Sequence, residues 1–120
     1  MERVNKILVH HKFIEYIDRI ARLEESRVFC KHEITHLIDV ARISYILSLE
    51  KKYDLGKEII YACALLHDIG RWKEYEEGID HAIASKELAV DILQDCGFKQ
   101  EEINLICSAI GHHRIKDNHP

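Results

Sequence analysis

The sequence is short of the residues that punctuate β-structure. Its 120 residues include one proline and five glycines, and it contains no Asn-Gly or Asp-Gly pair to mark a hairpin turn. Leu, Ile, Ala, Glu and Lys dominate instead, and these residues favour helices. Hydrophobic residues make up 47% of the chain, enough at this length for one core but not for two. We therefore expect an all-α fold, a single compact bundle of about five to six helices over residues 1–120.

Several classes of protein are disfavoured by what else is missing. No apolar run reaches the roughly 18 residues that span a bilayer, and no signal-peptide pattern opens the chain. We expect a cytoplasmic protein without a membrane partner. The net charge of −4 comes from interspersed acids and bases, with no basic block that would track polymeric nucleic acid. The four cysteines lack C-x-x-C spacing, which predicts free thiols, and the glycines form no phosphate-binding loop.

Hydrophobic periodicity predicts where the helices lie. The expected helices cover residues 4–23 with a break near His10 and His11, then 34–51, the apolar run 59–66 with its last turn up to Gly70, 81–96, and about 100–114. The charged stretch 71–78 is predicted to be a loop that could close over a site. Gly70 and Gly97 are expected to end the helices that precede them.

The most informative feature is the adjacent pair His67 and Asp68. It follows the apolar run 59–66, which is expected to be buried on all sides. Burying an unpaired polar group costs roughly 2–7 kcal/mol, and burying a charge costs more. In the last turn of a helix, the dipole also favours cations by about 0.3–1 kcal/mol. A bound divalent metal would satisfy both residues.

Three further histidines are predicted to face inward, each on a different helix. His36 begins an apolar stripe, His81 follows the helix cap Asp80, and His113 ends the stripe of the last helix. The stripe residues are Val40, Ile43 and Leu47 after His36, Ala84, Leu88 and Ile92 after His81, and Ile103, Ile106, Cys107 and Ile110 before His113. Mixed imidazole and carboxylate ligands suit Mn, Fe, Co, Ni or Zn rather than calcium.

This ordered set resembles the HD superfamily of metal-dependent phosphohydrolases, whose pattern is a histidine, a downstream His-Asp pair and a later aspartate. The stretches HLIDVA at 36–41 and CALLHDIGR at 63–71 carry the resemblance, which runs from about Cys30 to Arg114. It implies an HD-type helical domain with one or two divalent ions, drawn from Fe, Mn, Ni, Co, Zn and Mg.

Carried over to this chain, the resemblance implies His36, His67 and Asp68 as ligands of a first metal, with Asp68 bridging to a second. His81 and His113 match the added histidines of members with two metals. His112, beside His113, is a further candidate ligand. Two alternatives stay open for His32, one turn before His36: a further ligand, or a partner of one.

The pattern looks most like a bacterial subset that includes hydrolases of diadenosine tetraphosphate. It implies hydrolysis of a phosphoester or phosphoanhydride, in a nucleotide or other small phosphorylated metabolite, by a metal-activated water. Asp68 would orient that water. Arg71 resembles the basic residue that holds phosphate in relatives, and its forked donors fit phosphate oxygens.

One departure from the family pattern leaves alternatives open. The last aspartate usually lies on a further helix, and here Asp117, in a polar tail, is the only late candidate. One alternative is that the chain is truncated. The other is that a water, Asp117 or a neighbouring chain completes the site, and in the last case the protein would be a homo-oligomer. Two other hypotheses follow: a metal-organised module that binds a nucleotide without turnover, and a structural domain whose histidines are satisfied by hydrogen bonds.

Overall fold

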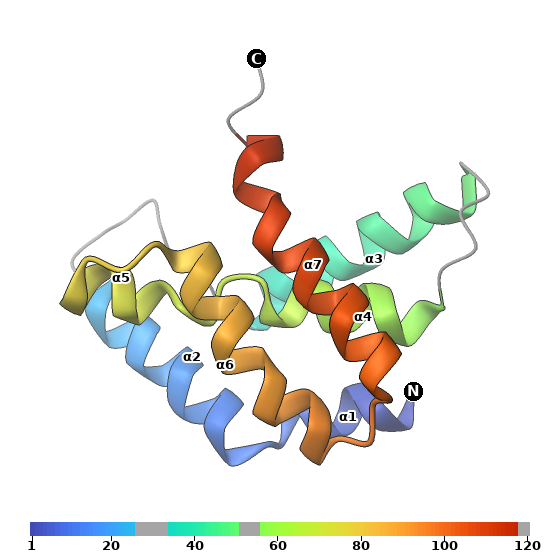
Figure 1. The fold of residues 1–120 in the computed structure, drawn as a ribbon, viewed down its shortest axis with the longest axis horizontal. Coiled ribbons are helices and arrows are strands. Elements are labelled where there is room, and N and C mark those ends of the chain that lie inside the picture. Colours follow the sequence, from blue (N-terminus) through green and yellow to red (C-terminus); the bar gives the residue numbers. More distant parts are fainter. Residues whose placement is uncertain (26–33, 51–55, 118–120) are drawn as a thin grey trace.

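The computed structural model describes residues 1–25, 34–50 and 56–117, with side chains described up to residue 111. The helices of these ranges are α1 Glu2–Leu8, α2 His11–Leu23, α3 Ile34–Glu50, α4 Lys57–Leu66, α5 Arg71–Glu77, α6 His81–Asp95 and α7 Gln100–Asp117 (Figure 1). No strand occurs in the described ranges. The prediction of an all-α bundle is confirmed. None of the described helices has the length and hydropathy needed to cross a membrane.

Helix α4 is the central element of the bundle. It contacts α1, α3, α6 and α7, and it lies near the middle of the molecule in Figure 1. Every residue from Ile59 to Leu66 is buried except Cys63, which is partly exposed. The helix can be apolar on all sides because neighbours cover all of its faces, as the sequence predicted.

The break between the first two helices lies where the sequence placed it. The side chain of His10 caps α2, because its Nδ1 accepts a hydrogen bond of 3.1 Å from the backbone N–H of Lys12. The Nε2 of His10 lies 2.8 Å from Oδ2 of Asp95 on α6. The cap and this contact together hold the turn between α1 and α2 against α6.

The predicted loop over residues 71–78 is instead the short helix α5. Trp72 is buried and stacks on Tyr16 of α2, with ring centroids 5.9 Å apart. The guanidinium of Arg19, also on α2, lies 4.1 Å from the centre of the Trp72 ring. Gly78 ends the helix with a left-handed φ of 71°. The prediction was wrong because most residues of this stretch are charged, and Trp72 is the one residue of α5 that is buried.

Gly70 has a different role from the predicted helix stop. Helix α4 ends at Leu66, so His67 occupies its C-cap and Asp68 lies beyond the helix rather than in its last turn. The φ of Gly70 is −87°, which any residue can adopt. A Cβ at this position would lie 2.4 Å from the backbone N of Ser85 and 2.6 Å from Cβ of Ala84. Gly70 is therefore needed for the close approach of α6.

Helix α3 buries a different face from the predicted one. Leu37, Ala41 and Ser48 are buried, whereas His36 is exposed, together with Ile43 at 59% and Leu47 at 47%. The prediction that His36 begins an inward-facing stripe is therefore wrong. Apolar residues occur on most sides of this helix, so periodicity alone could not identify the packed face.

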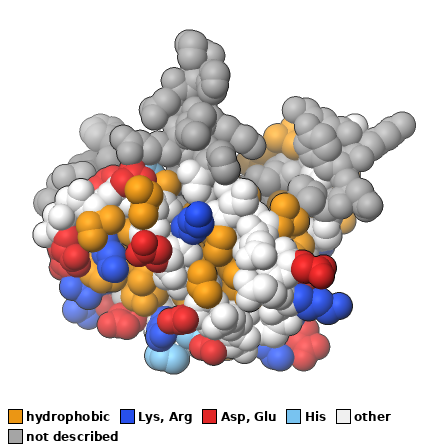
Figure 2. Space-filling model, viewed as in Figure 1, with side chains coloured by type: hydrophobic (Ala, Val, Ile, Leu, Met, Phe, Trp, Pro, Cys, Tyr) orange, Lys and Arg blue, Asp and Glu red, His pale blue; other side chains and the backbone are white. Residues whose placement is uncertain are grey.

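The surface and the cysteines follow the sequence predictions. On the face shown in Figure 2, acidic and basic side chains are interspersed among hydrophobic ones. Cys63, Cys96 and Cys107 are free thiols, and Cys30 lies outside the described residues. Burial raises the pKa of the Cys63 thiol to about 11, which keeps it protonated at neutral pH.

Candidate metal centre

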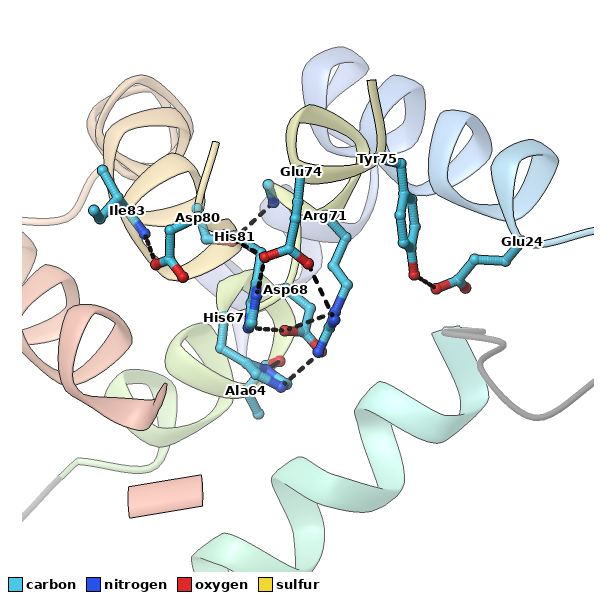
Figure 3. A network of polar contacts seen from close by, with 12 residues as sticks. Glu24, Ala64, His67, Asp68, Arg71, Glu74, Tyr75, Asp80, His81 and Ile83 are labelled. Atoms are coloured by element: carbon cyan, nitrogen blue, oxygen red, sulfur yellow. Dashed lines mark hydrogen bonds and ion pairs between the residues drawn. The ribbon is translucent and has the colours of Figure 1, made fainter. Parts of the chain in front are cut away.

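Polar side chains from the turn after α4, from α5 and from α6 converge on the carboxylate of Asp68 (Figure 3). Asp68 is only 6% exposed. Its Oδ2 lies 3.2 Å from Nε2 of His67, and its Oδ1 lies 3.8 Å from Nε2 of His81. Nε of Arg71 lies 3.6 Å from the same Oδ1. Two imidazoles and a guanidinium therefore surround one buried carboxylate.

The orientation of His67 is set by the helix that precedes it. Its Nδ1 lies 2.6 Å from the backbone carbonyl oxygen of Ala64. A carbonyl oxygen can only accept, so Nδ1 carries a proton, and in the neutral ring Nε2 is a lone pair. That lone pair faces an oxygen of Asp68, which is also an acceptor. A cation between the two, either a proton or a metal ion, resolves this repulsion.

His81 has the same arrangement on the other side of Asp68. It is the first residue of α6 and is buried, as the sequence predicted. Its Nδ1 lies 3.1 Å from Oε1 of Glu74, and the same oxygen accepts the backbone N–H of His81 at 3.2 Å. With the Nδ1 proton donated to Glu74, Nε2 presents its lone pair to Asp68. Metal-binding histidines are typically held in this way through the other ring nitrogen.

Glu74 completes the polar cluster from helix α5. Burial raises the pKa of Glu74, but the hydrogen bonds from His81 and the charge of Arg71 outweigh it and lower that pKa below its usual value. Its Oε2 lies 3.7 Å from Nη1 of Arg71. The ionised carboxylate thus contacts both a candidate metal ligand and the candidate phosphate-binding cation.

A second grouping of possible ligand atoms overlaps the first. Atoms of Glu74, Asp80 and His81 all lie within 4.8 Å of one another. Asp80 is also the N-cap of α6, as the sequence predicted. Its Oδ2 accepts the backbone N–H of Ile83 at 3.2 Å. The donors in both groupings are imidazole nitrogens and carboxylate oxygens, which fit the transition metals predicted for the site.

Glu74 was not predicted as a site residue. It belongs to the charged stretch 71–78, which the sequence predicted to be a loop. Its contact with His81 depends on α5 being a helix and on the turn at Gly78, which returns the chain to α6. The only signal of this contact in the sequence was Gly78, which lies between Glu74 and the candidate ligand His81.

The other predicted ligands stay predictions. His36 lies in the first turn of α3 with an exposed side chain. His112 and His113 lie within α7, but their side chains are outside the described set. Asp117 is the last residue of α7 rather than part of a tail. His32 lies outside the described residues altogether.

Comparison with known proteins gives a family match for the chain and several similar proteins. The HD domain family matches residues 34–120. An uncharacterized protein of Clostridium beijerinckii is 43% identical over 116 residues, which cover 97% of this chain and 74% of that protein. No solved structure matches.

Several of the similar proteins carry the name ribonuclease Y. The one from Clostridium botulinum (strain Hall) is 30% identical over 107 residues, covering 88% of this chain and 18% of that protein. The one from Staphylococcus epidermidis is 27% identical over 110 residues, covering 90% of this chain and 19% of that protein. The chain therefore spans less than a fifth of the length of these ribonucleases.

Proposed function

The chain belongs to the HD domain family, and from this premise we propose that it is a metal-dependent phosphohydrolase centred on Asp68. The observation that carries the proposal is the matched pair of histidines. His67 and His81 each donate a hydrogen bond from Nδ1 to an oxygen acceptor. Nε2 of His67 then faces Oδ2 of Asp68, and Nε2 of His81 faces Oδ1. This arrangement suits a cation held between imidazoles and a carboxylate.

His67, Asp68 and His81 would hold the metal, with Glu74 and Asp80 close to the same position. His36, His113 and His112 are proposed to complete one or two metal sites. When bound, the metal would polarise a phosphoryl oxygen and lower the pKa of a bound water.

The residues of the chain supply orientation and phosphate binding. The Ala64 carbonyl fixes the ring of His67, so its ligand nitrogen is already in place before a substrate arrives. Asp68 is proposed to orient the attacking water. Arg71 is about a quarter exposed and lies between the carboxylates of Asp68 and Glu74, which aim its planar donors. Such a guanidinium matches phosphate oxygens.

The proposed substrate is a nucleotide or another small phosphorylated metabolite in the cytoplasm, with dinucleoside polyphosphates such as diadenosine tetraphosphate as first candidates. The interspersed surface charge supports a small substrate, because polymer binding usually requires a basic stripe. A second candidate is RNA phosphodiester hydrolysis. The sequence similarity to the ribonucleases Y, which covers 88–90% of this chain, favours this candidate.

The test begins with protein purified without an affinity tag or chelator and analysed for metal. The protein, reconstituted with Mn²⁺, Fe²⁺, Co²⁺, Ni²⁺ or Zn²⁺, is then given p-nitrophenyl phosphate, bis-p-nitrophenyl phosphate, diadenosine tetraphosphate and a single-stranded RNA oligonucleotide. We expect metal-dependent hydrolysis of a small substrate. Preferential cleavage of the oligonucleotide would favour the second candidate.

Two variants and a control assign the activity to the centre. Asp68→Asn keeps the shape of the side chain but removes its charge, and it should lower hydrolysis at least 100-fold, as should His67→Gln. Glu77→Gln, on the exposed side of α5, should behave as wild type. Unchanged hydrolysis in the Asp68 and His67 variants would overturn the proposal. Stoichiometric metal without turnover of any substrate would instead support the non-catalytic nucleotide-binding module.

A further inference from the structure

Glu74 joins the two functional parts of the centre. One of its oxygens contacts both the ring and the backbone of His81, and the other faces Arg71 (Figure 3). Like Asp68, Glu74 contacts both a candidate ligand and the candidate phosphate-binding cation. Its side chain is about one third exposed, so it lies nearer the surface than Asp68, which is buried.

The ring of His81 has two neutral tautomers, and its two neighbours favour different ones. Nε2 lies 3.8 Å from Oδ1 of Asp68, and Nδ1 lies 3.1 Å from Oε1 of Glu74. Without Glu74, the Asp68 carboxylate would attract the ring proton to Nε2, because an ionised carboxylate is a strong acceptor. That tautomer would point an N–H at Asp68 and leave no lone pair there for a metal.

We propose that Glu74 is a positioning residue, which holds His81 in the Nδ1–H tautomer so that its Nε2 lone pair faces Asp68. This inference rests on the proposed function and deepens it. The shorter of the two ring contacts is the one to Glu74, and the backbone N–H of His81 binds the same oxygen. Ring and backbone are therefore fixed together, at the residue where α6 begins.

The neighbouring carboxylate of Asp80 has a role of its own at the start of α6. Its Oδ2 accepts the N–H of Ile83 as the cap of α6, so it is engaged with the helix backbone. Glu74 instead reaches His81 from the preceding helix. The orientation of the ring thus depends on how α5 is placed against the start of α6.

The first measurement uses ¹⁵N-labelled, metal-free protein and asks which ring nitrogen of His81 carries the proton, at a pH where the ring is neutral. The wild type should show Nδ1–H, and Glu74→Ala should shift the population toward Nε2–H. Glu74→Gln should keep the wild-type tautomer, because its amide oxygen can accept the same two hydrogen bonds. Glu77→Ala is the matched control on α5 and should match wild type. Chemical denaturation establishes that each variant is folded.

The second measurement titrates Mn²⁺ into the same four proteins by calorimetry. Glu74→Ala should weaken binding about 10–100-fold, as expected when the partner of a ligand histidine is lost. Glu74→Gln should stay within a few-fold of wild type. An equal loss in both variants would overturn the proposal, because Glu74 would then be a ligand itself. An unchanged His81 tautomer in Glu74→Ala would overturn it as well.

The two failures are distinguishable. If the wild type bound no metal, the proposed function would fail, yet the tautomer measured in metal-free protein would still decide whether Glu74 orients His81.

Discussion

Because Gly70 has no side chain, α6 can approach the turn that carries His67 and Asp68. The backbone N–H of Gly70 donates a 2.8 Å hydrogen bond to Oγ of Ser85, a buried residue of α6. The same approach brings His81, four residues earlier on α6, to Asp68. The spacing between the two ligands thus depends on the absence of a Cβ at residue 70.

We predict that Gly70→Ala destabilises the protein. The added Cβ would lie 2.4 Å from a backbone nitrogen, so α6 or the turn must shift, at a cost of about 1–3 kcal/mol. Urea denaturation measures this loss. Gly111→Ala is the matched control, since its Cβ would meet only the Lys86 side chain at 3.6 Å, and helical Ala gains about 0.5–1 kcal/mol over Gly. Equal stability of Gly70→Ala and wild type would contradict the close-approach argument.

At the scale of elements, α5 is a seven-residue helix held in place by α2. The stacking of Trp72 on Tyr16 is reinforced by an ion pair of 2.6 Å between Arg19 and Glu76. The hydroxyl of Tyr75 also donates to Glu24, a buried residue just after α2, at 2.6 Å. Because α5 also carries Arg71 and Glu74, helix α2, which lies outside the matched range 34–120, positions part of the centre.

We predict that Trp72→Ala lowers the free energy of unfolding by about 3–5 kcal/mol, as for other buried large-to-small changes. Circular dichroism during urea unfolding measures this, since the only tryptophan is lost in the variant. Hydrogen exchange should also increase across residues 71–77. In Glu77→Ala, neither quantity should change noticeably. A Trp72 variant with normal exchange in α5 would show that α2 does not hold this helix.

The elements show what sequence reasoning could and could not provide. The buried α4 and the cap of α6 were predicted, because unbroken apolarity and a capping aspartate are local signals. Helix α5 and the packed face of α3 were not, because each depends on a tertiary neighbour. The same difference holds in the centre: residue type and spacing predicted that His67, Asp68 and His81 face inward, and they lie together, but the contact of Glu74 required knowing where α5 lies.

At the scale of the whole molecule, Arg3 links three helices that are far apart in sequence. Its side chain lies 2.9 Å from Oε1 of Glu58 on α4 and 2.6 Å from Oε1 of Glu102 on α7. Its guanidinium also lies 4.3 Å from the centre of the Phe98 ring. The N-terminal helix α1 is thereby tied to both the central helix and the helix that carries His112 and His113.

This link predicts a dependence of stability on pH. For Glu102, the hydrogen bond from Arg3 is the main cause of a lowered pKa. For Glu58, burial raises the pKa, but the hydrogen bonds and charge of Arg3 outweigh it. A lowered pKa in the folded state means that the unfolded chain binds protons first as the pH falls. The stabilisation is therefore complete above the ordinary value near 4.5 and is lost as the pH falls through the lowered folded values.

We expect Arg3→Met to lower the free energy of unfolding by about 1 kcal/mol at pH 7, because the pairs are partly exposed and solvent screens them. The difference from wild type should shrink as the pH falls below the ordinary value near 4.5 and through the lowered folded values, because protonated glutamates leave the charge of Arg3 without a partner. Urea denaturation across this pH range measures it. Arg22→Met is the matched control, since its pair with Asp18 is exposed and lies within one helix. A difference that stayed constant with pH would show that Arg3 acts through contact with Phe98 instead of through its charge.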